Sequence, residues 1–232
     1  MTSASPAAFV VMSAILDPVS DDPVTELGAR RRAATRRRQV IAAGHSGRVG
    51  LARTGLGDPD PEVQAAAVGA LARLSSLTVA DITWALRTGA TPVRRRATDA
   101  ALSVRGPGSR STLYSALAGA LRDPDPLVVV GAAWFLAERQ VTAAVAGLVT
   151  CARTHEDVRC REAAVAALGA IGDRRGLPAV IGALDDKPTV RRRATVALAG
   201  FDDPRVEPAL RRSAGDRDWQ VRQAAEELLG EE

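Results

Sequence analysis

The sequence predicts an all-α fold, a right-handed α-solenoid of about six to seven helical hairpins. Similar segments recur every 30 to 35 residues, a repeat length typical of stacked helical hairpins. Of the 232 residues, 46% are hydrophobic but only 3% are aromatic, and alanine is abundant, which favours closely packed helices over a sheet. Turns rich in Asp and Pro precede the alanine-rich segments, as is typical of helix starts.

The alanine-rich segments share one internal pattern. Each begins with an apolar anchor, has alanine four positions later, and has leucine or alanine eight positions later. At 100° per residue these offsets lie on one side of a helix, so we expect them to face the core. The anchors are Val63, Val93, Val128, Cys160, Val190 and Val221, and the alanines are Ala67, Ala97, Ala132, Ala164, Ala194 and Ala225. Small residues there should let neighbouring helices approach closely.

The order of elements follows from this period. Residues 1–20 are predicted to form an N-terminal apolar half-unit cap, and residues 21–232 the repeat array, with clear repeats over 58–232. A basic helix over 29–43 is expected to belong to an earlier, degenerate unit anchored at Ala29 or Thr35. Each first helix is followed by a shorter apolar segment, such as 78–86 or 177–184, so one period is a helical hairpin.

Four segments together resemble the HEAT repeat, in the short subtype also found in phycobilin lyases: DPDPEVQAAAVGALARL, HEDVRCREAAVAALGAIGD, DDKPTVRRRATVALAGFDD and DRDWQVRQAAEELLG. The resemblance implies an α-solenoid but no single activity, because the family includes scaffolds, lyase subunits and DNA-binding enzymes. It also implies ladders in which an Asp before each first helix and an Arg after the anchor link neighbouring units. The matching residues are Asp58, Asp123, Asp185 and Asp216, and Arg94, Arg161, Arg191 and Arg222. Gln64 and Val129 depart from the pattern, so the ladder is not expected to be continuous.

The hexapeptide VRRRAT occurs twice, at residues 93–98 and 190–195. Both copies lie at equivalent starts of first helices, three periods apart. Duplication of the repeat unit therefore explains the likeness without a shared chemistry.

Three residues raise the question of a metal site. Cys151, His155 and Cys160 are of the types that bind zinc. Cys160, however, occupies an anchor position, and His155 stands where four units place Asp, so we expect buried thiols and a helix-cap histidine. The glycine-containing loop over 106–112 lacks the lysine and the spacing of a phosphate-binding loop. No metal or cofactor is expected, and the sequence favours a non-enzymatic protein without excluding activity.

The surface carries the remaining functional signal. In HEAT arrays the second helices line the concave side, and here they are rich in arginine. We expect a partner-binding surface made of Trp84 with Arg48, Arg53, Arg87, Arg110, Arg122, Arg153, Arg211 and Arg212. Several of these arginines lie near helix C-termini, where a cation is also stabilised by the helix dipole.

Three functional hypotheses follow from that surface. The leading one is a scaffold or adaptor that binds another protein through acidic groups. The second is a nucleic-acid-binding protein related to the HEAT-like DNA glycosylases, although no residue-by-residue motif match supports it. The third is a lyase-like subunit. The net charge of +4 fits an anionic partner.

Cysteine content and hydropathy bear on location. The two cysteines are too few for a disulfide framework and fit a reducing, cytoplasmic compartment. The apolar run over 7–16 has about half the length that crosses a bilayer, so no membrane association is predicted.

Overall fold

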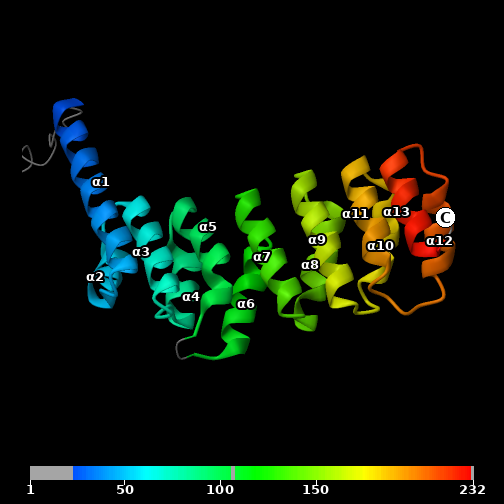
Figure 1. Cartoon of the computed structure of the whole chain (residues 1–232), viewed down its shortest axis with the longest axis horizontal. Helices are drawn as coiled ribbons and strands as arrows, with labels where there is room; N and C mark the ends of the chain where they lie inside the picture. Colours follow the sequence, from blue (N-terminus) through cyan, green and yellow to red (C-terminus); the bar gives the residue numbers. More distant parts are fainter. Residues whose placement is uncertain (1–22, 106–107, 231–232) are drawn as a thin grey trace, which may run out of the picture.

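The computed structural model describes residues 23–105 and 108–230, and the cap predicted for residues 1–20 lies outside these ranges. In the described residues the chain forms thirteen α-helices, four short 3-10 turns and no strand. The hairpins stand side by side in chain order, in one row that runs from α1 at one end to α12 and α13 at the other (Figure 1). The predicted α-solenoid is confirmed.

Each hairpin pairs a first helix with a second. The first helices are α1 (Pro23–His45), α3 (Pro61–Arg73), α5 (Thr91–Ala100), α7 (Pro126–Glu138), α9 (Val158–Ile171), α11 (Pro188–Leu198) and α13 (Trp219–Leu229). The second helices are α2 (Val49–Thr54), α4 (Val79–Thr88), α6 (Arg110–Ala120), α8 (Val145–Thr154), α10 (Leu177–Gly182) and α12 (Val206–Ala214). Successive first helices contact one another along the whole row. Six hairpins and a final first helix are thus described.

The Asp-Pro turns start the first helices in the expected way. Asp60 is the N-cap of α3, and its carboxylate accepts hydrogen bonds from the backbone N–H groups of Glu62 and Val63. Asp125 does the same for α7. In both helices Pro occupies the first turn, where no N–H is needed for the helix ladder. The turn sequence therefore fixes where these two helices begin, whereas α5 and α11 begin after a residue that forms no side-chain cap.

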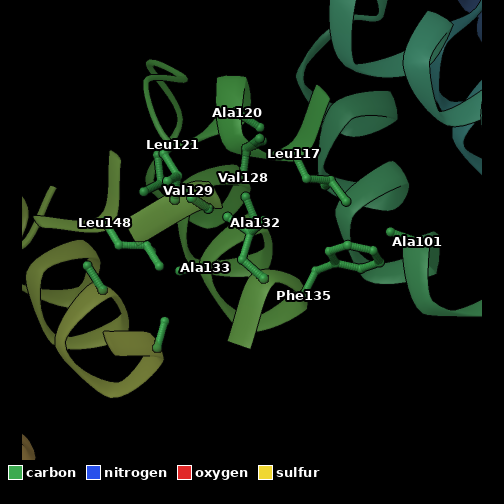
Figure 2. Close-up of a cluster of buried hydrophobic side chains, with 14 of the residues drawn as sticks. Ala101, Leu117, Ala120, Leu121, Val128, Val129, Ala132, Ala133, Phe135 and Leu148 are labelled. Atoms are coloured by element: carbon green, nitrogen blue, oxygen red, sulfur yellow. The ribbon is translucent and has the colours of Figure 1, made fainter. Parts of the chain in front are cut away.

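The anchors and alanines form one continuous seam. All six anchors and all six alanines are at most 1% exposed. Around α7, Val128 and Ala132 lie in the interior, and the ring of Phe135 extends toward Ala101 at the end of α5 (Figure 2). Phe135 also packs edge-on against Tyr114 of α6, with ring centroids 6.0 Å apart. The core is shared between units, because each hairpin completes that of its neighbour.

Small residues allow the backbones of neighbouring first helices to approach closely. A Cβ atom placed on Gly169 of α9 would lie 2.6 Å from the Cβ of Ala197 on α11. Even alanine would therefore force these two helices apart.

Helix α1 follows the register of Thr35, one of the two expected, but without a buried anchor. Ala29 and Thr35 are both exposed, whereas Val40 and Gly44 are buried. Gly44 packs against α3 nine positions after Thr35, as Gly169 packs against α11 nine positions after its anchor. An exposed threonine at the anchor position hid this register from a search for apolar anchors.

Candidate functional site

Arginine–aspartate pairs connect the hairpins at the starts of the first helices. Arg94 donates two hydrogen bonds to Asp123, from Nε at 2.7 Å and Nη2 at 2.9 Å. Arg191 binds Asp216 in the same way, with both bonds at 2.8 Å. The third amino group of each arginine donates to a carbonyl of its own preceding turn. Each arginine thus ties two adjacent units together.

Two ladder residues differ from the expectation. Arg161 binds Asp186, at 2.6 and 2.7 Å, and Asp185 instead accepts a hydrogen bond from Arg212. The reason is local, because Asp185 ends a 3-10 turn and is exposed, whereas Asp186 is extended and half-buried. Arg222 lies in α13, and among residues 23–105 and 108–230 its side chain donates only to the carbonyls of Asp216 and Arg217 in its own preceding turn.

The ladder begins earlier than the sequence indicated. Arg36 of α1 donates to both oxygens of Asp58, at 2.7 and 2.9 Å. The ladder is interrupted where Gln64 and Val129 replace arginine. Gln64 still donates to the carbonyl of Asp58, at 2.7 Å, but Val129 is fully buried. The expected discontinuity is therefore present.

These ion pairs predict how stability depends on pH. The hydrogen bond from Arg36 lowers the pKa of Asp58, and those from Arg161 and Arg191 lower the pKa values of Asp186 and Asp216. A carboxyl group whose pKa is lowered by folding stabilises the fold above its unfolded pKa, and this contribution is lost as pH falls through the folded pKa.

We therefore expect the melting temperature to be level above about pH 5 and to fall steeply below about pH 4. Thermal melts followed by circular dichroism between pH 7 and pH 2.5 test this. The Asp216→Asn variant, which has no carboxyl group to protonate at this position, should show a smaller fall of the melting temperature at low pH. An equally stable fold at pH 3 and pH 7 would show that the ladder contributes little.

The predicted partner-binding arginines fall into two groups. Four are engaged within the chain. Arg53 binds Asp81 at 2.9 Å and the carbonyl of Ser76 at 2.7 Å, which links two hairpins. Arg211 binds Glu207, Arg212 binds Asp185, and Arg48 donates to the Ser46 hydroxyl at 3.1 Å. The other four are exposed and have no hydrogen bond or ion pair within the described residues: Arg87, Arg110, Arg122 and Arg153.

Two of the unpaired arginines border a groove on the second helices. A cavity of about 720 Å³ lies between α4 and α6, and Arg87 and Arg122 line it. A second cavity, of about 450 Å³, lies between α6 and α8. Arg122, Asp123 and Pro124 line both cavities. We call the two together the second-helix groove, which spans three successive units.

The groove is lined by hydrogen-bonding groups and small residues. The carboxylate of Asp123 accepts hydrogen bonds from Arg94 and from the N–H of Asp125, and it forms no ion pair with Arg122. Hydroxyl-bearing residues, which the sequence analysis missed, line both parts: Thr83, Ser111, Thr112, Ser115, Thr150 and Thr154. Their signal in the sequence is the four-residue spacing of Ser111 and Ser115, and of Thr150 and Thr154, along one helix face. Guanidinium donors and hydroxyl oxygens together suit a polar, negatively charged chain.

The remaining predicted surface residues lie outside this groove. Trp84 of α4 is half-buried and packs against the core, so only part of its ring faces solvent. Arg110 lines a separate, smaller cavity of about 280 Å³ beside Arg105 and Arg139. Arg153, in the last turn of α8, is exposed but lines neither cavity of the groove.

The cysteines and His155 are held in structural contacts. Cys151 donates to the carbonyl of Cys160 at 3.6 Å, and Cys160 to that of Pro126 at 3.5 Å. Burial raises the pKa of Cys151 to about 11 and that of Cys160 to about 12. His155 accepts a hydrogen bond from the N–H of Asp157 through Nδ1. Residues 23–105 and 108–230 contain no cluster of three or more potential metal ligands.

In the same two ranges, every helix is too short or too polar to span a bilayer.

Comparisons with known proteins agree with this architecture. The sequence pattern of HEAT repeats matches residues 114–198 and 184–231, about half of the chain. No curated protein matches the chain. The structure of the complex of CpcE and CpcF of phycocyanin lyase from Nostoc sp. PCC7120 is similar, with 23% identity and a TM-score of 0.54, covering 76% of this chain and 74% of that one. A designed armadillo repeat protein has 19% identity and a TM-score of 0.52, covering 77% of this chain and 97% of that one. These likenesses show a shared fold.

Proposed function

Because the chain belongs to the HEAT repeat family, we propose that it is a non-enzymatic scaffold or adaptor that binds an acidic segment of another protein in the second-helix groove. The observation that carries the proposal is the pair of unpaired arginines, Arg87 and Arg122, on the walls of one groove. Each guanidinium offers five N–H donors in a planar fork that suits carboxylates. An extended acidic segment would cross α4, α6 and α8 with an arginine on either side.

The groove also supports binding of a polypeptide rather than a small molecule. Its two parts are open and continuous over three units, whereas sites for small molecules enclose most of their ligand. The hydroxyls of Thr150 and Thr154 already donate to helix carbonyls, so their free lone pairs can accept hydrogen bonds from backbone N–H groups. Arginine side chains and hydroxyl groups would thus bind the acidic side chains and the backbone of one segment.

Charge reversal tests the proposal. The double variant Arg87→Glu/Arg122→Glu should lose at least about tenfold in affinity for the partner captured from native lysate, because two attractive contacts become repulsive. Quantitative mass spectrometry of the captured proteins measures this, and circular dichroism should show unchanged helicity. Arg53 is unsuitable for such a test, because Arg53→Glu would place two carboxylates beside each other at Asp81.

A matched control is available on the first helices. Arg38 and Arg192 are exposed and form no hydrogen bond or ion pair within the described residues, and neither lines the groove. The variant Arg38→Glu/Arg192→Glu changes the net charge by the same amount and should capture the partner as the wild type does. Equal loss in both double variants would assign the effect to overall charge and would refute the groove as the binding site.

A further inference from the structure

A second groove lies on the first helices at the N-terminal end of the row. It has a volume of about 560 Å³, lies between α1, α3 and α5, and shares no lining residue with the second-helix groove. We call it the first-helix groove. Four arginines line it against two acids, Glu62 and Asp99: Arg37, Arg73, Arg95 and Arg96. The groove therefore attracts anions.

Two of these arginines are held in place without using their hydrogen-bond donors. Arg96 of α5 lies over Gly69 of α3, since a Cβ on Gly69 would be 3.5 to 3.9 Å from its Cδ, Nε and Cζ atoms. Arg73 of α3 lies over Gly44 of α1, with Nη1 at 2.7 Å from a Cβ placed there. In the described part of the chain, neither guanidinium forms a hydrogen bond or an ion pair.

The second copy of VRRRAT shows why Arg96 is unpaired. Its equivalent in that copy is Arg193 of α11, which binds Glu162 of the preceding first helix at 3.2 Å. The position equivalent to Glu162 in α3 is occupied by Ala65, which lines the first-helix groove. One hexapeptide thus forms an internal ion pair at one place and leaves a guanidinium free at the other.

We propose that the first-helix groove binds the phosphate backbone of double-stranded nucleic acid through Arg37, Arg73 and Arg96. Arg95 is held by Asp125 at 2.5 Å and is left out of the site, whereas the one ion pair of Arg37 within the described residues, with Glu62, is 3.6 Å long. The three arginines come from three successive first helices, whose axes are typically about 8–10 Å apart, so they can contact several phosphates.

The floor of the groove argues against the other anionic partners. Besides Ile41 and Pro92, the uncharged lining residues are small, Ser103 carries their only hydroxyl group, and no aromatic residue is among them. The groove therefore lacks the rows of hydroxyl groups that suit a peptide backbone in the second-helix groove, and the aromatic stacking surface that single-stranded nucleic acid needs. A duplex backbone needs neither, since its binding depends mainly on phosphate contacts.

Fluorescence anisotropy of the full chain with a fluorescein-labelled 20-base-pair DNA duplex tests this. Three phosphate contacts predict that raising NaCl from 50 to 200 mM weakens binding about 40-fold, and Arg96→Ala should reduce this factor to about 12-fold. Arg192→Ala, which removes an exposed and unpaired arginine of α11 from the second hexapeptide, is the control and should leave the salt dependence unchanged.

A second variant tests the same arginine without removing it. Ala65→Glu should neutralise Arg96 as Glu162 neutralises Arg193, and should weaken DNA binding to the extent that Arg96→Ala does. Absence of binding at 50 mM NaCl, or equal loss with Arg192→Ala and Arg96→Ala, would overturn the proposal. A 20-residue polyglutamate peptide serves as the competitor, at the same total concentration of negative charge as the DNA. If it displaces the duplex, the assignment to nucleic acid is overturned.

Discussion

Replacing Arg191 with alanine is expected to lower the free energy of unfolding by about 3 kcal/mol, the largest effect of any ladder substitution. Only 6% of the Arg191 side chain is exposed, and 14% of that of Asp216. Removing the guanidinium leaves the Asp216 carboxylate nearly buried and without its cation, and the carbonyl of Asp186 without its donor. Breaking a buried pair in this way costs far more than the net value of the pair.

Two other arginine-to-alanine variants, measured by urea denaturation, provide a comparison for the stability loss of Arg191→Ala. Arg192→Ala alters the adjacent, exposed residue and should change stability by less than about 0.5 kcal/mol. Arg36→Ala breaks a pair of the same geometry whose arginine is 39% exposed and screened by solvent, so a clearly smaller loss than at position 191 is expected. Equal losses at positions 191 and 36 would show that burial does not determine the strength of the ladder.

Replacing Ala164 with leucine is expected to cost about 1–3 kcal/mol. Ala164 is fully buried on α9, a helix that packs against both α7 and α11. The three added carbon atoms have no space in this seam and must push the neighbouring helices apart. Because every hairpin is stabilised by its neighbours, the effect should reach both adjacent units. Ala194→Leu, at the equivalent position of α11, should have a similar cost.

The control lies six residues further along the same helix. Ala170 of α9 is exposed, so Ala170→Leu adds the same atoms to the same element without entering the seam. Urea denaturation should show a change below about 0.5 kcal/mol for this variant. Wild-type stability of Ala164→Leu would contradict the packing of the alanine seam.

The repeat architecture could be predicted from the sequence because the same residue pattern recurs in every unit. Val63, Val128 and Val190 can be aligned without a structure, and helix geometry then places the alanines four positions later in the core. Helix α1 was harder because an exposed residue, Thr35, occupies the anchor position and no apolar periodicity marks it. Its register depends on how it packs against α3, and the sequence of one helix alone does not reveal that packing.

The functional surface could be predicted only in part, because the pairing of arginines depends on neighbouring units. Arg96 and Arg193 occupy the same position in the same hexapeptide, and the residue on the preceding helix decides which one is free. Likewise Asp185 and Asp186 are adjacent in sequence, and only the end of a 3-10 turn determines which one meets Arg161. The sequence shows how many arginines the chain has, but only the contacts within the fold show which of them are free to bind a partner.

The most direct test of the binding role is site-specific photo-crosslinking in native lysate. A photoreactive phenylalanine analogue replaces Ser115, which is exposed in the second-helix groove, or Val196, which is 46% exposed on α11. The proposed function predicts a defined protein adduct from position 115 that disappears with Arg87→Glu/Arg122→Glu, and no equivalent adduct from position 196. An adduct only from position 196, or one from position 115 that persists after the charge reversal, would contradict it.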